Sequence, residues 1–324
     1  MDDWRSRARC YSMGTLLKTA KRCDVLTDVA FAVGPDENLQ IFKAHRLIMA
    51  CGSPVFQKIL YGQSYVNFSG VIRLQYVNPL AFQYMIDCLY DEDPVFPDLT
   101  VASEVYKVAI RFEANRVKML AERFLRHAIT SKSVFFILEF AIENGLLNLK
   151  ERCLKSMLPI LYCILTSDNF ATSSLETAKT ILDKIRNKCS KIQYLSLMAI
   201  GNWKKRNKRY PENGVKYLLK CVNFDKVELW NFNDFISRYS NILTKSEALE
   251  ITKYLLSPDR FKLPEWCTPD ASYCGISDAP AVLRDSSDED SELRNNFSVM
   301  DSSGLTKILV SPMNSIPGLF PPNI

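Results

Sequence analysis

The sequence predicts an α+β N-terminal domain, then an all-α helical domain, and a largely irregular C-terminal tail. Three observations lead to this order. Strand patterns occur only in the first 75 residues or so, and apolar residues recur at helical spacing from Thr100 to about Leu256. After Pro258 the chain is rich in Pro, Ser, Asp and Asn and has no sustained periodicity. A chain of 324 residues is long enough for two domains of ordinary size.

Composition places the chain among globular proteins. Hydrophobic residues make up 47% and charged residues 24%, and the net charge of +5 is too mild to call for a nucleic-acid partner. The N-terminal segment carries charges throughout, unlike a secretory leader, and the longest apolar run, "MLPILYCIL", is too short to span a bilayer. We therefore expect a soluble protein of the cytoplasm, or of cytoplasm and nucleus, with no membrane partner.

The first domain begins with a predicted β-hairpin. In "DVAFAVG" (residues 28–34), Val29, Phe31 and Val33 alternate onto one face, as in a strand. The residues "PDEN" then form a turn, and "LQIFKAH" (residues 39–45) returns as the second strand.

The period then changes to that of helices. A short apolar helix is expected from Arg46 to Cys51, with Gly52 just past its end. Ser53 is placed to cap a second helix that has Pro54 at its first position. A third strand follows at residues 71–74. After it, Asn78-Pro79 repeats the cap-and-proline start of a helix, whose apolar stripe comprises Phe82, Met85, Ile86 and Leu89.

The chain has only two histidines, and one of them, His45, precedes Cys51 by a few residues. A nucleophilic pair needs an exposed thiolate beside the imidazole. Because the neighbours of Cys51 in "LIMACG" are apolar, we expect this thiol to be buried and inert, and His45 to bond backbone groups at the strand-to-helix junction. Most of the ten cysteines are likewise expected to be reduced and buried.

No motif for chemistry is present. The sequence contains no glycine-rich phosphate loop, G-x-S-x-G elbow, H-E-x-x-H pair or acidic metal cluster. We therefore expect no catalytic residue, no cofactor, no metal and no enzymatic activity.

Two charged stretches remain. The basic run "NWKKRNKRYPEN" (residues 202–213) fits either a nuclear-localisation or polyanion patch, or a helix end whose cations offset the helix dipole, and we favour the helix end. The acidic tract "RDSSDEDSE" (residues 284–292) would suit phosphorylation at Ser286 or Ser287.

Residues 26–93 resemble a BTB/POZ domain. The shared pattern is an Asp-Val strand start, the F-x-A-H-R junction at Phe42 to Arg46, the S-P-V-F helix start at Ser53, and a strand followed by a long helix. The helical half resembles the BACK domain that follows BTB in many adaptors, in the branch without kelch repeats. The expected divisions are an N-terminal dimerisation segment (1–22), a BTB/POZ domain (23–128), a BACK domain (129–257) and a disordered or loosely packed tail (258–324).

This resemblance implies a dimeric adaptor that bridges a cullin of the third class to an unknown substrate protein for ubiquitination. The alternative is a dimeric BTB scaffold or transcriptional co-regulator that binds no cullin. A short N-terminal helix gains stability by packing on a partner subunit. The dimer-interface candidates are Trp4, Leu16, Leu17, Asp28 and Arg46.

The resemblance also implies a cullin surface. BTB adaptors commonly carry a hydrophobic residue, any residue and then Glu after the S-P-V-F helix, and the matching positions here are Tyr65 and Asn67. The aromatic anchor is kept, but the acid is replaced by a neutral amide, which weakens the contact. Acidic residues at Asp91 and Glu92 restore negative charge nearby and complete the set of cullin-contact candidates.

Overall fold

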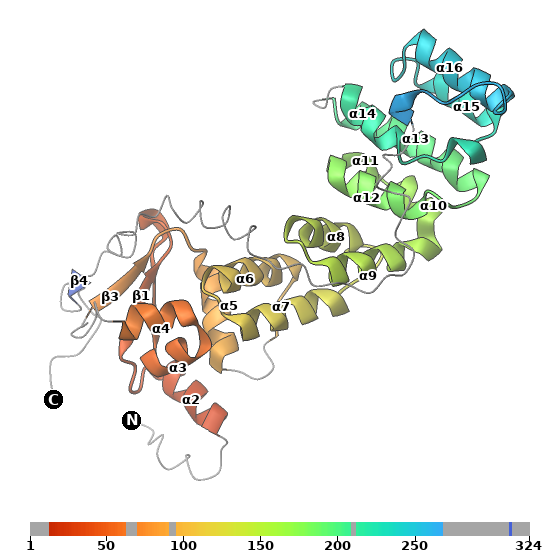
Figure 1. The fold of residues 1–324 in the computed structure, drawn as a ribbon. Coiled ribbons are helices and arrows are strands. Elements are labelled where there is room, and N and C mark those ends of the chain that lie inside the picture. The colour runs from red at the N-terminus through yellow and green to blue at the C-terminus, as the bar shows by residue number, and fades with distance from the viewer. Residues whose placement is uncertain (1–12, 63–69, 91–94, 209–211, 268–310, 313–324) are drawn as a thin grey trace. The chain divides into compact units, whose positions relative to one another are not determined.

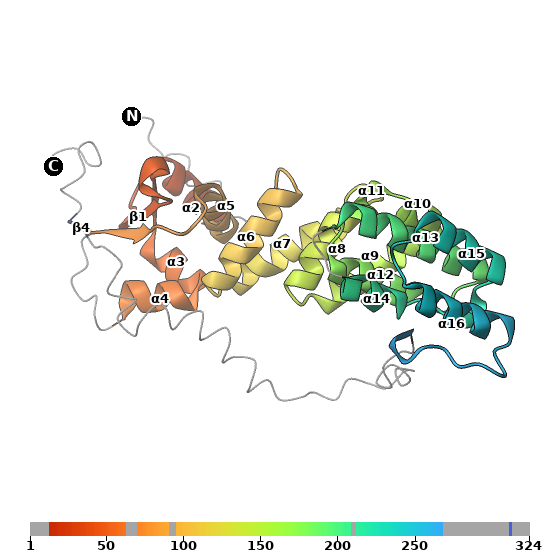
Figure 2. The same ribbon diagram turned by 90° about the horizontal axis from the view of Figure 1, so that it is seen from above.

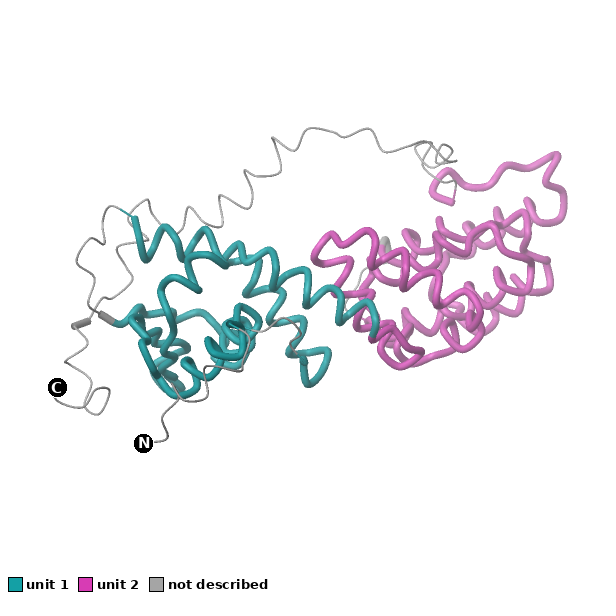
Figure 3. Tube along the Cα trace, turned by 90° about the horizontal axis from the view of Figure 1, so that it is seen from below, with its two compact units in different colours: residues 1–127, 282–324 teal, residues 128–281 magenta. Residues whose placement is uncertain are grey.

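A computed structural model describes residues 13–62, 70–90, 95–208, 212–267 and 311–312. The chain divides into two compact units: residues 1–127 with 282–324, and residues 128–281 (Figure 3). The first unit combines a small mixed sheet with helices and the second is helical, which confirms the predicted fold class.

The sheet of the first unit has the strand order β2-β1-β3-β4. Its strands are β1 (Val29–Val33), β2 (Gln40–Ala44), β3 (Gly70–Leu74) and β4 (Ser311–Pro312). β1 and β2 form the predicted antiparallel hairpin, with Phe31 opposite Phe42 and a short 3-10 helix, η1 (Asp36–Asn38), in the turn. β3 runs parallel to β1, with Ile72 beside Phe31, and β4 pairs antiparallel with the start of β3.

Six helices accompany this sheet in the described part of the first unit (Figure 1): α2 (Met13–Arg22), α3 (Arg46–Gly52), α4 (Pro54–Tyr61), α5 (Pro79–Tyr90), α6 (Leu99–Arg111) and α7 (Asn115–His127). Both predicted caps are confirmed. The Ser53 hydroxyl accepts from the Phe56 amide at 3.1 Å, and the Asn78 side chain accepts from the Leu80 amide at 2.9 Å. These bonds satisfy amides that the first helical turn leaves without partners.

Gly52 does not follow α3 as predicted but is its last residue, and Ser53 is the C-cap. A Cβ on Gly52 would lie 2.5 Å from Cδ2 of Leu89 in α5. The glycine therefore allows α3 to approach α5 closely, which is a packing role and not a turn role.

An aromatic cluster forms the core of this unit on one face of the sheet. The Phe31 ring of β1 lies 5.3 Å from the rings of both Phe56 and Phe82, in edge-to-face geometry. Phe56 in turn stacks on Phe112, the residue after α6, at 4.5 Å. Phe31, Phe56 and Phe82 are fully buried. This cluster ties β1 to α4, α5 and the end of α6.

The second unit consists of helices alone in its described part. They are α8 (Val134–Glu143), α9 (Leu147–Met157), η3 (Leu158–Ile160), α10 (Leu161–Leu165), α11 (Asp168–Thr172), α12 (Leu175–Ile185), α13 (Ser190–Arg206), α14 (Glu212–Leu219), η4 (Phe224–Lys226), α15 (Leu229–Arg238), α16 (Lys245–Leu256) and η5 (Glu265–Cys267). α13 contacts α10, α11, α14 and α15 (Figure 2). From α13, the fully buried Trp203 donates its indole N–H to the Ser173 carbonyl at 2.9 Å.

The first residues of the tail pack on this helical unit. Cys267 is buried. The Nζ of Lys216, in α14, lies 5.5 Å from the ring centroid of Trp266. The same Nζ forms an ion pair with Glu247 of α16 at 2.5 Å. Apart from β4, the tail beyond Cys267 lies outside the described residues. Within the described chain, no helix is both long and apolar enough to cross a membrane.

Candidate interaction site

Helix α2 has an apolar face that the described part of the chain covers only in part. Met13, Leu16, Leu17 and Ala20 follow the i, i+3, i+4, i+7 spacing of one helical face. No residue of α2 is buried, and Met13 is 71% exposed. A ten-residue helix is marginal in water by itself, so most of its stability must come from packing. This face is therefore a candidate interaction surface.

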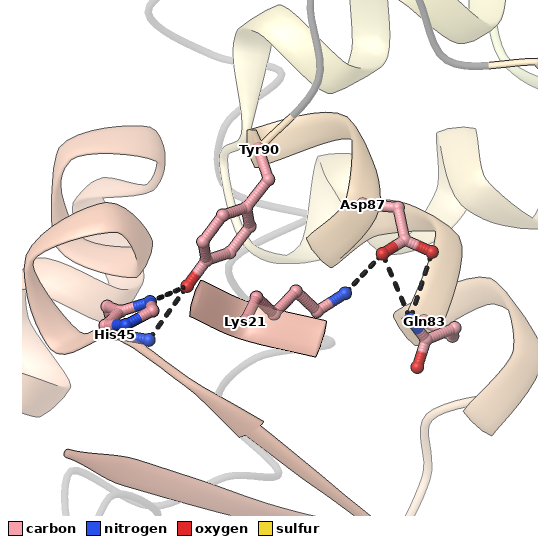
Figure 4. Close-up of polar contacts among 5 residues, drawn as sticks. All are labelled: Lys21, His45, Gln83, Asp87 and Tyr90. Atoms are coloured by element: carbon pink, nitrogen blue, oxygen red, sulfur yellow. Dashed lines mark hydrogen bonds and ion pairs between the residues drawn. The ribbon is translucent and has the colours of Figure 1, made fainter. Parts of the chain in front are cut away.

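Polar contacts hold α2 on α5 (Figure 4). The Nζ of Lys21 forms an ion pair with Asp87 and lies 5.6 Å from the ring centroid of Tyr90. The side-chain amide of Gln83 donates to both oxygens of Asp87, at 3.0 and 3.1 Å. The Lys21 side chain is mostly buried, so this pair is screened less than a surface ion pair. These bonds fix the orientation of α2.

His45 joins three parts of the same unit. Its Nε2 lies 3.0 Å from the Val25 carbonyl, so Nε2 carries the proton. Its Nδ1 then accepts from the Tyr90 hydroxyl at 2.7 Å, while the Tyr90 oxygen accepts from the His45 backbone N–H at 2.9 Å (Figure 4). Burial raises the pKa of Tyr90 to about 12, which keeps the phenol protonated and able to donate. The imidazole of His45 thus bonds a backbone group, but that group is Val25, before β1, and not one at the strand-to-helix junction as predicted.

Asp28 and Arg46 both make contacts inside the protomer. The Asp28 carboxylate, just before β1, accepts from the backbone N–H of Arg46 at 2.6 Å, at the start of α3. The Arg46 guanidinium donates to the Leu60 carbonyl and lies 4.8 Å from the ring of Tyr61. Asp28 therefore anchors the first turn of α3. The role of both residues in a dimer interface stays a prediction.

The prediction that Cys51 is buried is wrong, because the structure places this thiol on the surface. Met49, two positions earlier, is fully buried. Residues two apart on a helix point about 200° apart, so an inward Met49 turns Cys51 outward. Both ring nitrogens of His45 bond Val25 and Tyr90, so the imidazole is not paired with this thiol.

Thiol accessibility divides the described cysteines into two groups, all of them free. Burial raises the pKa of Cys153 and of Cys267 to about 12. We expect a thiol reagent at neutral pH to modify the exposed group in the native protein, and the buried group only after denaturation. Peptide mapping of the labelled chain checks this, and rapid native labelling of Cys153 would contradict it. The exposed group is Cys23, Cys51, Cys163 and Cys189, and the buried group is Cys88, Cys153, Cys221 and Cys267.

Several predicted site residues lie outside the described part of the chain: Trp4, Tyr65, Asn67, Asp91 and Glu92. Leu16 and Leu17 lie on the apolar face of α2. In the basic run, Lys204, Lys205 and Arg206 form the last turn of α13, which is the helix end that the sequence favours.

Sequence reasoning missed the residues that hold α2 in place. Lys21 and Asp87 are 66 positions apart, and His45 and Tyr90 are 45 positions apart. No local pattern links positions so distant, because helix and strand periods report only which residues share a face. The His45 junction motif is the one signal that marks this region.

Comparison with known proteins finds a domain-family match for part of the chain. Residues 17–129 match the BTB/POZ domain model. The chain is 24% identical over 236 residues to the human BTB/POZ domain-containing protein 3, covering 70% of this chain and 44% of that protein. It is 22% identical over 252 residues to the human BTB/POZ domain-containing protein 6, covering 74% and 45%.

A plant protein gives a shorter match. The Arabidopsis thaliana BTB/POZ and MATH domain-containing protein 3 is 31% identical over 157 residues, covering 44% of this chain and 37% of that protein. The chain therefore spans less than half the length of these relatives. The BTB/POZ match indicates a protein–protein interaction adaptor, a class that is generally non-enzymatic.

Proposed function

The chain carries a BTB/POZ domain over residues 17–129, and on that premise we propose that it is a homodimeric adaptor that holds other proteins together. The observation that supports the proposal is the partly exposed apolar face of α2, with Met13 exposed and Leu16 and Leu17 half-buried. A second copy of the chain would bury this face in a two-fold interface, to which both copies contribute the same patch. Such an adaptor works through surfaces and needs no catalytic residue.

We expect Leu16→Asp/Leu17→Asp to convert the dimer to a monomer. Two carboxylates on the apolar face would have to be desolvated in the dimer, which is strongly unfavourable. Light scattering after size-exclusion chromatography measures the molar mass in solution. It should give twice the chain mass of 37.1 kDa for the native protein and 37.1 kDa for the variant. The control is Thr15→Asp/Thr19→Asp, which adds the same charge to α2 on exposed positions of another face and should stay dimeric.

Two outcomes of this measurement would contradict the proposal. One is a native chain that is monomeric at every concentration tested. The other is a Leu16→Asp/Leu17→Asp variant that remains a dimer with unchanged circular dichroism. Loss of the dimer in the threonine control would mean that charge alone, and not the apolar face, disrupts association.

The finer part of the proposal is a cullin bridge. The BTB unit would bind a third-class cullin through Tyr65, Asn67, Asp91 and Glu92, and the helical unit, as a BACK domain, would position whatever recruits substrate. The competing function is a dimeric scaffold or transcriptional co-regulator without cullin, in cytoplasm or nucleus. Co-precipitation with the cullin distinguishes the two functions, because only the bridge retains it.

A further inference from the structure

A basic cavity lies between α2 and α5, within the first unit. Its volume is about 440 Å³, and its walls include Lys18, Lys21 and Arg22 of α2 facing Gln83, Tyr84 and Asp87 of α5. Figure 4 shows Lys21 reaching from α2 to Asp87, which Gln83 also contacts. A cavity of this volume is in the range of peptide and small-molecule sites.

The charge of this cavity is positive. Three cations line it against the single carboxylate of Asp87, and that carboxylate is already paired with Lys21. The cavity therefore favours a ligand with more than one negative charge. Val95, 83% exposed at the rim, adds apolar surface that suits a peptide better than a bare ion.

The basic face of α2 is distinct from its apolar face. Lys18, Lys21 and Arg22 are spaced i, i+3, i+4, and they point roughly 140° away from the Leu16–Leu17 face at 100° per residue. A dimer formed through the apolar face would leave the cavity open. The two surfaces can therefore act independently, so a ligand in the cavity would add a property beyond the proposed adaptor function and would not depend on it.

We propose that the α2–α5 cavity binds the chain's own acidic tract, residues 284–292, in cis. The tract has five carboxylates within eight positions: Asp285, Asp288, Glu289, Asp290 and Glu292. Clustered charges of opposite sign attract at short range even where single exposed pairs contribute little. Phosphorylation at Ser286 or Ser287 adds further negative charge and tightens the contact.

Chain length permits this contact. Ser311 is anchored on β3 of the same unit, about 19 residues after Glu292. That linker can span roughly 60 Å when extended, at about 3.3 Å per residue. A compact unit of this size is about 35–40 Å across, from a radius of gyration near 14 Å. The tract can therefore reach any face of the first unit from its anchor.

The basic end of α13 is the alternative acceptor, and the structure favours it less. Lys205 lies 4.4 Å from the ring of Tyr239, and Arg206 pairs with Asp168 at 3.3 Å. Arg206 and Asp168 are both largely exposed, so this helix end lies open to solvent. The α2–α5 cavity instead has two walls, with cations on the α2 wall and the α5 side chains on the other, so it would contact a ligand from two sides. If the acidic tract of the same chain occupies the cavity, an acidic partner protein must displace the tract before it can bind there.

The test uses a fluorescein-labelled peptide of residues 284–292, added to the full chain at about 0.05 M salt, where charge screening is modest. In a second chain, called the neutralised chain, the five acids of the tract are changed to the corresponding amides. This tract can no longer occupy the cavity through its charge, so the cavity is open to the added peptide. We expect the peptide to bind this chain at least about tenfold more tightly than the native chain, whose tract competes. Adding Lys18→Glu/Arg22→Glu to the neutralised chain should weaken peptide binding at least about tenfold. Lys21 is left unchanged because it holds α2 on Asp87.

The control is Lys204→Glu/Lys205→Glu in the same neutralised chain, which should bind the peptide unchanged. Three results overturn the proposal: no peptide binding to the neutralised chain, equal binding to the native and neutralised chains, or binding lost by the α13 reversal and kept by the cavity reversal. Circular dichroism and light scattering on each variant ensure that altered folding or assembly is not read as altered binding. A monomeric native chain would count against the dimer alone and leave this test intact.

Discussion

Phe82→Ala should lower the free energy of unfolding of the first unit by about 3–5 kcal/mol, as large-to-small changes in aromatic cores do. Phe82 is fully buried, and its ring lies 5.3 Å from Phe31 and 5.6 Å from Phe42. Removing it opens a cavity between α5 and the hairpin. Denaturation followed by hydrogen exchange and mass spectrometry measures this, because peptides from β1 and α5 report on this unit alone.

The matched control is Tyr76→Ala, another aromatic of the first unit, which is 78% exposed. Surface substitutions of this kind usually change stability by less than about 0.5 kcal/mol. If Phe82→Ala destabilises the unit no more than Tyr76→Ala does, the aromatic cluster is not its core.

Trp203→Ala should have a similar effect on the second unit, again about 3–5 kcal/mol from the cavity. The Ser173 carbonyl would also lose its indole donor, and an unpaired buried group adds about 1–3 kcal/mol. Trp203→Phe fills most of the space but removes the N–H, so it should fall between the native chain and Trp203→Ala. Chemical denaturation followed by circular dichroism measures the three chains.

Trp230→Ala provides the comparison, since this tryptophan is 63% exposed on α15. We expect it to destabilise the helical unit far less than Trp203→Ala. Equal losses from the two tryptophans would show that burial on α13 is not what stabilises this unit.

Local signals were enough to predict the elements that build the first unit. Alternation at Val29, Phe31 and Val33 located β1, and the dipeptides Ser53-Pro54 and Asn78-Pro79 located the starts of α4 and α5. Each signal acts within a few residues of the feature that it specifies, through strand faces or through caps. This is why boundaries set by caps were predicted to within a residue or two.

The candidate site was less predictable because it depends on tertiary contacts. The burial of Cys51 was inferred from its apolar neighbours, yet a seven-residue helix cannot turn every residue of "LIMACG" inward. Helical spacing from Met49 was the signal that could have corrected it. No such signal exists for the Lys21–Asp87 pair or for the Tyr90 hydroxyl on His45, since both join residues from separate elements.

Titration calorimetry of the full chain against the N-terminal domain of a third-class cullin measures the adaptor function directly. We expect binding by the native chain, tightened by Asn67→Glu, because a charge-assisted hydrogen bond is roughly twice as strong as a neutral one. A gain of about 1.4 kcal/mol corresponds to a tenfold lower Kd. Tyr65→Ala should remove binding, because the aromatic anchor is lost. No detectable heat from either the native chain or Asn67→Glu would contradict the cullin bridge and leave the cullin-free scaffold in its place.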